Sequence, residues 1–227
     1  MSGRTPADAR GWAALGTRLF LAAAEGFGPA EYAAPTPLPG WSRAHLAAHL
    51  AANADALGNL VHWAATGEPT PMYASPEERL AGIERGRALP AAELTSWVRE
   101  SAERLTAGLD ALTPEQWQAP VTTAQGRTVP AAELPWLRAR EACVHAVDLA
   151  AGTAFADLPA GFLAALCADV LAKRAPAFAL RTPDGGVRWN PPGDGDQPVV
   201  EAELPQLAAY LTGRRHIEGA PPLGPWL

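Results

Sequence analysis

The stretch REACVHAVD, residues 140–148, places a carboxylate and an imidazole four residues apart in an otherwise apolar run. Residues at this spacing lie on one face of an α-helix, one turn from each other. Glu141 and His145 on a buried face cost free energy unless a partner satisfies them, and a divalent metal ion can bind both. The stretch therefore predicts a helix that turns two metal ligands toward a helical core.

A second stretch, WSRAHLAAHLAAN at residues 41–53, repeats this spacing with His45 and His49. Catalytic zinc sites commonly have three protein ligands and one open position, and two His with one Glu form a known ligand set. His49, Glu141 and His145 supply that set, and His45 competes as the upstream ligand because it lies one turn earlier. Two helices that each turn polar ligands inward predict a metal site built inside a helix bundle.

Four further side chains lie near the candidate ligands or share their chemistry. Asn53 continues the upstream histidine face by one turn and is a candidate to support a ligand or to contact a cofactor or substrate. Asp148 follows the downstream histidine by three residues, and it either reaches the same region or faces solvent. Cys143 points about 160° away from the candidate ligands around the helix, so we interpret it as a packed core residue. Cys167 lies in another apolar run and is interpreted in the same way.

Length and composition restrict the classes of function. The chain has 227 residues, a hydrophobic fraction of 48% and a net charge of −6. The negative charge and the absence of a basic stripe argue against nucleic-acid binding, and no apolar run is long enough to cross a bilayer. The N-terminus lacks the apolar segment of a signal peptide, and two cysteines are too few for a disulfide framework. We expect a cytoplasmic protein that binds small molecules, as a monomer or weak homodimer.

Capping residues, prolines and glycines divide the chain into elements. Helices are predicted over residues 6–25, 42–66, 76–88, 90–109, 130–152, 159–174 and 204–211. Residues 26–40 are predicted to be a proline-broken loop, and residues 119–128 to be irregular or extended, with a turn at Gly126. Runs at 178–181 and 187–190 flank an Asp-Gly turn, which predicts a β-hairpin, and residues 199–202 add a strand. The expected fold is mainly α, with a helical-bundle metal-binding domain over residues 1–153 and a small α+β domain over residues 154–227.

The two histidine-bearing stretches together resemble the mycothiol-dependent maleylpyruvate isomerase family, part of a wider DinB-like group of thiol-dependent metalloenzymes. The resemblance covers nearly the whole chain, and its most specific part is the segment EACVHAVDL at residues 141–149. It implies a DinB-like four-helix bundle, a zinc ion bound by His49, Glu141 and His145, and mycothiol as the thiol cosubstrate.

The resemblance also implies two functional arginines that bind the carboxylates of the substrate. One corresponds to Arg79 in SPEERL, residues 75–80, and the other to Arg214 in LTGR, residues 211–214. Arg215 follows directly, so the resemblance leaves open which of these two enters the site, and Arg215 remains a candidate for cofactor binding.

The implied reaction is the cis–trans isomerisation of an unsaturated acid that resembles maleylpyruvate. The thiolate of mycothiol adds to the cis double bond, the resulting single bond rotates, and the thiol leaves the trans isomer behind. An S-transferase that retains the thiol adduct would need the same zinc site, so it is a second hypothesis. A non-catalytic, metal-containing regulator is a third, although a site with an open position argues against a purely structural zinc.

Overall fold

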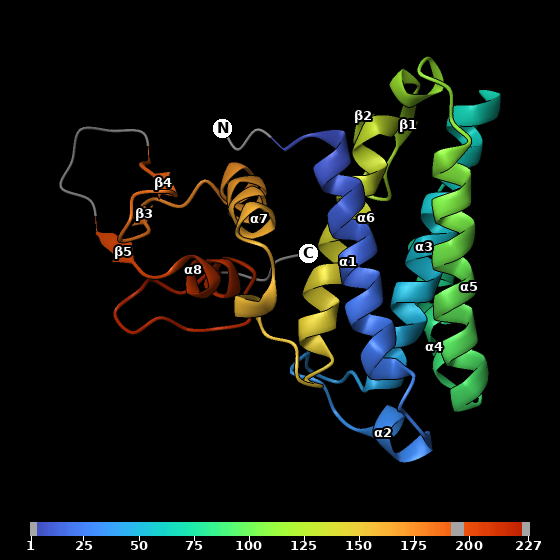
Figure 1. Cartoon of the computed structure of the whole chain (residues 1–227), viewed down its shortest axis with the longest axis horizontal. Helices are drawn as coiled ribbons and strands as arrows, with labels where there is room; N and C mark the ends of the chain where they lie inside the picture. Colours follow the sequence, from blue (N-terminus) through green and yellow to red (C-terminus); the bar gives the residue numbers. More distant parts are fainter. Residues whose placement is uncertain (1–3, 192–197, 224–227) are drawn as a thin grey trace. The chain divides into compact units, whose positions relative to one another are not determined.

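The computed structural model describes residues 4–191 and 198–223 of the chain (Figure 1). The chain divides into two compact units, one spanning Pro6–Thr153 and the other Ala154–Leu227 with Met1–Thr5. Within the described residues, no helix has both the length and the apolar character needed to cross a membrane.

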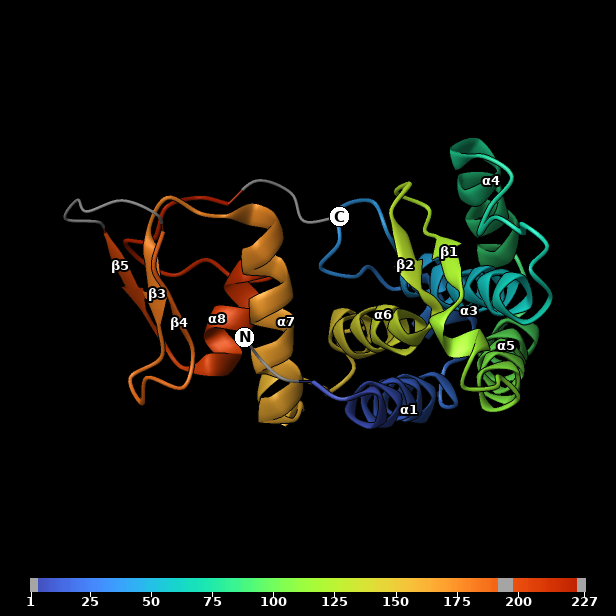
Figure 2. The ribbon, with the colours of Figure 1, turned by 90° about the horizontal axis from the view of Figure 1, so that it is seen from above.

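Four long helices form the bundle of the larger unit, and Figure 2 shows them end-on. They are α1 (Pro6–Ala24), α3 (Arg43–Thr66), α5 (Ala91–Asp110) and α6 (Leu134–Asp148). Helix α1 packs mainly against α6, and α3 packs against both α5 and α6. The mainly α fold with a helical bundle, predicted from the sequence, is confirmed.

The ends of these helices follow the capping signals in the sequence. Gly67 ends α3 in the left-handed region, at φ 77°, which a residue without a Cβ adopts at little cost. Ser75 begins α4 (Pro76–Arg87) by accepting a hydrogen bond from the backbone N–H of Glu78 at 3.1 Å. The helix starts predicted at residues 42 and 76 are therefore confirmed to within one residue.

Three segments of the larger unit either differ from the sequence-based expectations or decide between them. The predicted loop 26–40 contains the short helix α2 (Pro29–Ala33), because a proline at the first helical position removes only an N–H that has no helical partner. The segment predicted to be irregular or extended forms an antiparallel hairpin of β1 (Pro120–Thr122) and β2 (Thr128–Pro130), which follows the 3₁₀ turn Gln116–Gln118. Helix α6 is shorter than predicted, because a 3₁₀ turn precedes it at Ala131–Glu133 and Ala150 takes a positive φ of 49°.

Close packing against α1 holds α6 in place. A Cβ atom added to Gly16 of α1 would lie 2.5 Å from the backbone nitrogen of Cys143 and 2.8 Å from its Sγ. Only glycine fits at such a close approach of two helices. Phe20 of α1 and Ala142 of α6 are fully buried in the same core. The position of α6 is therefore fixed by its contact with α1.

The smaller unit has a three-stranded sheet with the strand order β4-β3-β5. Strand β3 (Ala179–Arg181) pairs antiparallel with β4 (Arg188–Trp189) and parallel with β5 (Val199–Glu201). Its helices are α7 (Ala160–Arg174) and α8 (Leu204–Leu211), which pack together, and a 3₁₀ turn lies at Phe155–Asp157. The predicted hairpin, strand and last helix are confirmed.

Candidate metal centre

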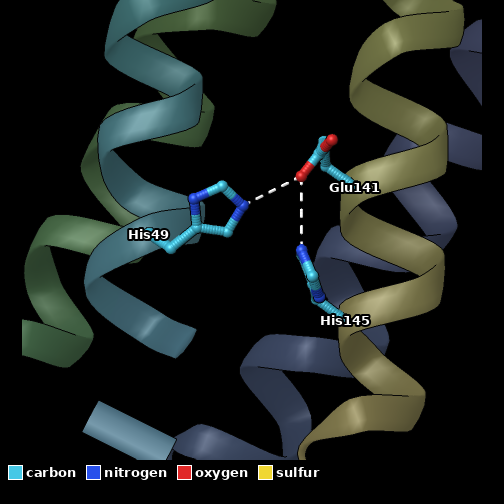
Figure 3. Close-up of side chains that lie close together, drawn as sticks. All are labelled: His49, Glu141 and His145. Carbon is cyan, nitrogen blue, oxygen red and sulfur yellow. Dashed lines mark hydrogen bonds and ion pairs between the residues drawn. The ribbon is translucent and has the colours of Figure 1, made fainter. Parts of the chain in front are cut away.

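One histidine of α3 and two side chains of α6 converge inside the bundle (Figure 3). Nε2 of His49 lies 2.9 Å from Oε2 of Glu141, and Nε2 of His145 lies 3.2 Å from the same oxygen. One donor atom from each of the three residues lies within 4.8 Å of the other two. The rings of His49 and His145 are nearly perpendicular, at 85°, with their centroids 5.0 Å apart.

These separations fit a metal ion. Ligand atoms at about 2.0–2.1 Å from a tetrahedral zinc ion lie about 3.3 Å from one another. The two separations from Glu141, 2.9 and 3.2 Å, are close to that value, so small side-chain movements would place an ion between the three donors. The donor set of two imidazoles and one carboxylate is also one that zinc prefers.

His45, the competing upstream candidate, lies outside this group because its ring is hydrogen-bonded to Ser42 at the start of α3. Its Nδ1 accepts a hydrogen bond from the backbone N–H of Ser42 at 3.1 Å and lies 2.8 Å from Ser42 Oγ. Its Nε2 lies 3.5 Å from Glu84 on α4. The structure therefore brings His49, and not His45, together with the two side chains of α6.

Asp148 reaches the site from behind His145 and does not face solvent. Its Oδ2 lies 2.9 Å from Nδ1 of His145, and the residue is only 1% exposed. A carboxylate on one ring nitrogen fixes the proton there and directs the lone pair of the other nitrogen toward a metal. This contact leaves Nε2 of His145 as the donor atom for the site.

The buried charges of the site influence one another strongly. Burial would raise the pKa of Glu141, but hydrogen bonds with His145 and His49 hold it well below its usual range. Burial would lower the pKa of His145, but its hydrogen bonds with Asp148 and Glu141 raise it to about 9. Burial lowers the pKa of His49. Glu141 is therefore an anion at neutral pH, which is the form that binds metal ions.

A buried arginine links the two helices that carry the site. Nη1 of Arg138 on α6 donates hydrogen bonds to the Leu50 carbonyl oxygen at 2.8 Å and to Asn53 Oδ1 at 3.0 Å, both on α3. Burial lowers the pKa of Arg138 to about 10, and the nearby Glu141 carboxylate opposes this shift, so the side chain stays cationic at neutral pH. Asn53, a candidate to support a ligand or to contact a cofactor or substrate, thus accepts a hydrogen bond that links α3 to α6.

Arg79 and Trp41 lie beside the ring of His49, and Tyr73 lies beside Arg79. Nη2 of Arg79 lies 3.4 Å from Nδ1 of His49, and Cζ of Arg79 lies 5.9 Å from the centroid of the Tyr73 ring. Burial raises the pKa of Tyr73, although the charge of Arg79 partly opposes that effect. The Trp41 ring centroid lies 5.5 Å from that of His49 and 6.2 Å from that of His45. The structure therefore places Arg79, which the resemblance implies to be a functional arginine, beside His49.

The remaining predicted residues belong to other parts of the chain. Arg214 and Arg215 lie in the smaller unit, where Arg214 is half-buried and Arg215 is exposed. Nη1 of Arg214 donates to the Thr212 carbonyl oxygen at 2.6 Å. The two cysteines are buried, and burial raises the pKa of both thiols to about 12. Sγ of Cys143 lies 3.3 Å from the Trp12 carbonyl oxygen on α1, so this thiol packs away from the donor group.

Sequence reasoning did not identify Arg138 or Tyr73. The signal for Arg138 was its position three residues before Glu141, which places both on one face of α6. Tyr73 follows a proline-rich segment, and no periodic pattern in such a segment indicates where a side chain points. Only the folded chain shows that it lies beside Arg79.

Comparisons with known proteins identify the family of this chain. The family model described as the mycothiol maleylpyruvate isomerase N-terminal domain matches residues 13–150. A crystal structure of a mycothiol-dependent maleylpyruvate isomerase is 37% identical in sequence and has a TM-score of 0.87, over 93% of this chain and 90% of the other. A mutant form of such an enzyme, with a histidine replaced by alanine, gives the same values. A search of the curated proteins found no match. The chain belongs to the mycothiol-dependent maleylpyruvate isomerase family.

Proposed function

We propose that this protein is a zinc-dependent enzyme that uses mycothiol to isomerise a maleylpyruvate-like cis acid to its trans form. The observation that carries the proposal is the convergence of His49, Glu141 and His145 on one point in a chain of this family. A zinc ion with four ligands would have one position beyond the two imidazoles and the carboxylate, which is the arrangement of catalytic zinc sites.

Zinc bound by these residues would supply a Lewis acid that lowers the pKa of a thiol and holds it as the thiolate. Asp148 keeps a proton on Nδ1 of His145 and so keeps its Nε2 available as a donor. Arg138 holds the backbone of α3 against α6, which preserves the distance between His49 and Glu141. The protein itself needs no nucleophile, and both of its cysteines are buried with raised pKa values.

Arg79 is proposed to bind a carboxylate of the substrate. When Nε2 of His49 serves as a ligand, its Nδ1 carries the proton, and Arg79 then has no acceptor on that ring. Its guanidinium becomes available for a bidentate contact with a carboxylate. Arg214 is proposed to bind a second carboxylate, and its half-buried position favours it over the exposed Arg215.

The reaction conserves all atoms of the substrate. A thiol bound at this site would supply a thiolate that adds to one carbon of the cis double bond, while the π electron pair of the double bond moves onto the conjugated carbonyl group. After rotation about the resulting carbon–carbon single bond, the electron pair would return and the carbon–sulfur bond would break, which restores the thiolate. The positive charges of Arg79 and Arg138 stabilise the negative charge that develops on the substrate.

The test combines metal analysis with an isomerisation assay. The purified protein should contain about one zinc ion per chain, and mycothiol with maleylpyruvate should give the trans product only when the zinc is present. Accumulation of a thiol adduct without trans product would show an S-transferase instead. Protein that binds no zinc in a direct titration would exclude the proposed metalloenzyme.

A further inference from the structure

A cavity of about 620 Å³ lies between α1 and α5, the two helices that form one side of the bundle in Figure 2. Pro135 and Arg138 of α6 also line this cavity. His49, Glu141 and His145 are not among its lining residues, so it is distinct from the candidate metal centre. Its volume falls within the range of about 300–1,000 Å³ that is typical of sites for small organic molecules.

The hydrogen-bonding capacity of Arg138 is only partly used by the protein. The residue is 3% exposed, and its Nη1 donates to the Leu50 carbonyl oxygen and to Asn53 Oδ1. Its Nε and Nη2 are also buried, and neither has a hydrogen-bond partner within the described residues. A buried donor without an acceptor costs free energy, because it has lost its hydrogen bonds to water. The fold therefore keeps two donors of this arginine in reserve at the wall of the cavity.

The two unpartnered nitrogens of Arg138 share one edge of the planar guanidinium group. The N–H of Nε and one N–H of Nη2 point in the same direction, at a spacing that matches the two oxygens of a carboxylate. The side chain is cationic at neutral pH, since burial lowers its pKa only to about 10. Glu141 and Asp55 are close enough to influence that pKa, but neither accepts a hydrogen bond from this edge. The free edge of Arg138 therefore suits a carboxylate that comes from outside the chain.

The rest of the cavity wall combines small apolar groups with an excess of positive charge. Alanine and leucine side chains of α1 and α5, together with the ring of Pro135, form its apolar part, and the described lining residues include no aromatic side chain. Four arginines and two acidic residues supply the charged groups. Small aliphatic walls suit an alkyl chain, because they remove its surface from water without offering an aromatic face for stacking. The positive excess favours an anion.

We infer that the cavity between α1 and α5 binds a carboxylate with an aliphatic chain, such as a fatty acid of medium length. The carboxylate binds the free edge of Arg138, and the chain lies against the alanine and leucine side chains of α1 and α5. This assignment goes beyond the proposed function and does not depend on it, because no candidate metal ligand lines the cavity.

Calorimetric titration with octanoate, and with octan-1-ol as its uncharged counterpart, tests both parts of the assignment. We expect the native protein to bind octanoate at least about tenfold more tightly than octan-1-ol, because only octanoate can pair with the guanidinium edge. Arg138→Lys keeps the charge but loses that edge, so the ratio of the two affinities should fall about tenfold. A general loosening of the fold would weaken both ligands alike and leave the ratio unchanged.

A second variant fills the cavity and leaves Arg138 in place. Ala14 is an exposed residue of α1 that lines the cavity, so Ala14→Phe adds a ring there without disturbing the core. Both octanoate and octan-1-ol should bind this variant at least about tenfold more weakly than the native protein. Ala22→Phe is the matched control, because Ala22 is an exposed alanine of the same helix that does not line the cavity, and it should leave both affinities unchanged.

Three results would overturn the assignment: no binding of octanoate to the native protein, equal affinities for octanoate and octan-1-ol, or native affinity for octanoate in Ala14→Phe. A carboxylate could also bind a metal ion, so His145→Ala separates the two places. We expect this variant to bind octanoate as tightly as the native protein does. Loss of octanoate binding in His145→Ala would place the carboxylate at the metal centre and contradict the assignment.

Discussion

The two faces of α6 differ sharply. The apolar face carries Ala142, Cys143 and Ala146, which are almost completely buried, and the first two of these lie against Gly16 of α1. The other face carries charged or ionisable side chains at helical spacing, namely Arg138, Glu141, His145 and Asp148. The apolar face has no freedom to shift, so the polar face presents its charges at fixed positions. The fold can hold a buried ionic site here because the tight apolar packing of α6 against α1 keeps the charged side chains of the other face in position.

Removal of the shared carboxylate on the polar face should have the largest effect. Glu141→Gln keeps the shape of the side chain but removes its charge, so zinc affinity should fall on the order of a thousandfold. Competition with a chromogenic chelator measures this affinity. Glu93→Gln on the exposed surface of α5 is the control, and it should leave the affinity unchanged. Equal zinc affinity in both variants would show that Glu141 is not a ligand.

A change on the apolar face should have the next largest effect, and it should act on stability. Gly16→Val brings a Cβ to 2.5 Å from the backbone nitrogen of Cys143, so the helices must separate, and the free energy of unfolding should drop by about 3 kcal/mol. Gly11→Val in the same helix, where space is open, is the matched control. Urea denaturation measures both variants, and a similar loss in the two would disprove the close-contact explanation.

Loss of the contact between Asp148 and His145 should lower the zinc affinity less than loss of a direct ligand does. Asp148→Asn retains a hydrogen-bond acceptor but loses the charge that polarises the imidazole, so zinc affinity should fall about 10–100-fold. The same chelator competition measures it. Asp110→Asn, at a surface ion pair with Arg10, serves as the control and should not change zinc binding. An unaltered affinity in Asp148→Asn would show that the carboxylate has no part in orienting the ring.

The hydrogen bonds of Arg138 that link α3 to α6 should make a smaller contribution to the free energy of unfolding. Arg138→Lys keeps the charge but loses the planar geometry that reaches Leu50 and Asn53 together, so the free energy of unfolding should fall by about 1–2 kcal/mol. Arg99→Lys, at an exposed pair with Glu25, is the control and should change it by less than about 0.5 kcal/mol. An equal free energy of unfolding in the two variants would show that the hydrogen bonds of Arg138 to α3 do not stabilise the fold.

The buried thiol of Cys143 on the apolar face should not react with alkylating reagents in the folded state. Because burial raises the pKa of Cys143 to about 12, the thiol stays protonated below that pH, and the thiolate is the reactive form. Iodoacetamide at pH 8 should leave both cysteines unmodified in native protein and alkylate both in urea. Rapid alkylation of Cys143 in the native protein, detected by mass spectrometry, would show that the apolar face of α6 opens.

Helical periodicity predicted the pairing of Glu141 with His145, because one turn of one helix sets their separation. It could not choose between His45 and His49, since both lie on the same face of α3. The choice came from the contact of His45 with Ser42 at the start of the helix. The role of Asp148 was also open, because its burial depends on packing that a helical pattern does not specify. Tyr73 lies in an irregular segment where periodicity carries no information.

The position of Trp41 has a spectroscopic consequence. Its ring centroid lies 5.5 Å from that of His49, so the indole is close to any ion held at the three donors. Zinc has a filled d shell and no redox chemistry, whereas cobalt in the same site has unpaired electrons that quench a nearby excited state. The contribution of Trp41 to the fluorescence of the eight tryptophans should therefore be smaller in a cobalt-loaded chain than in a zinc-loaded one.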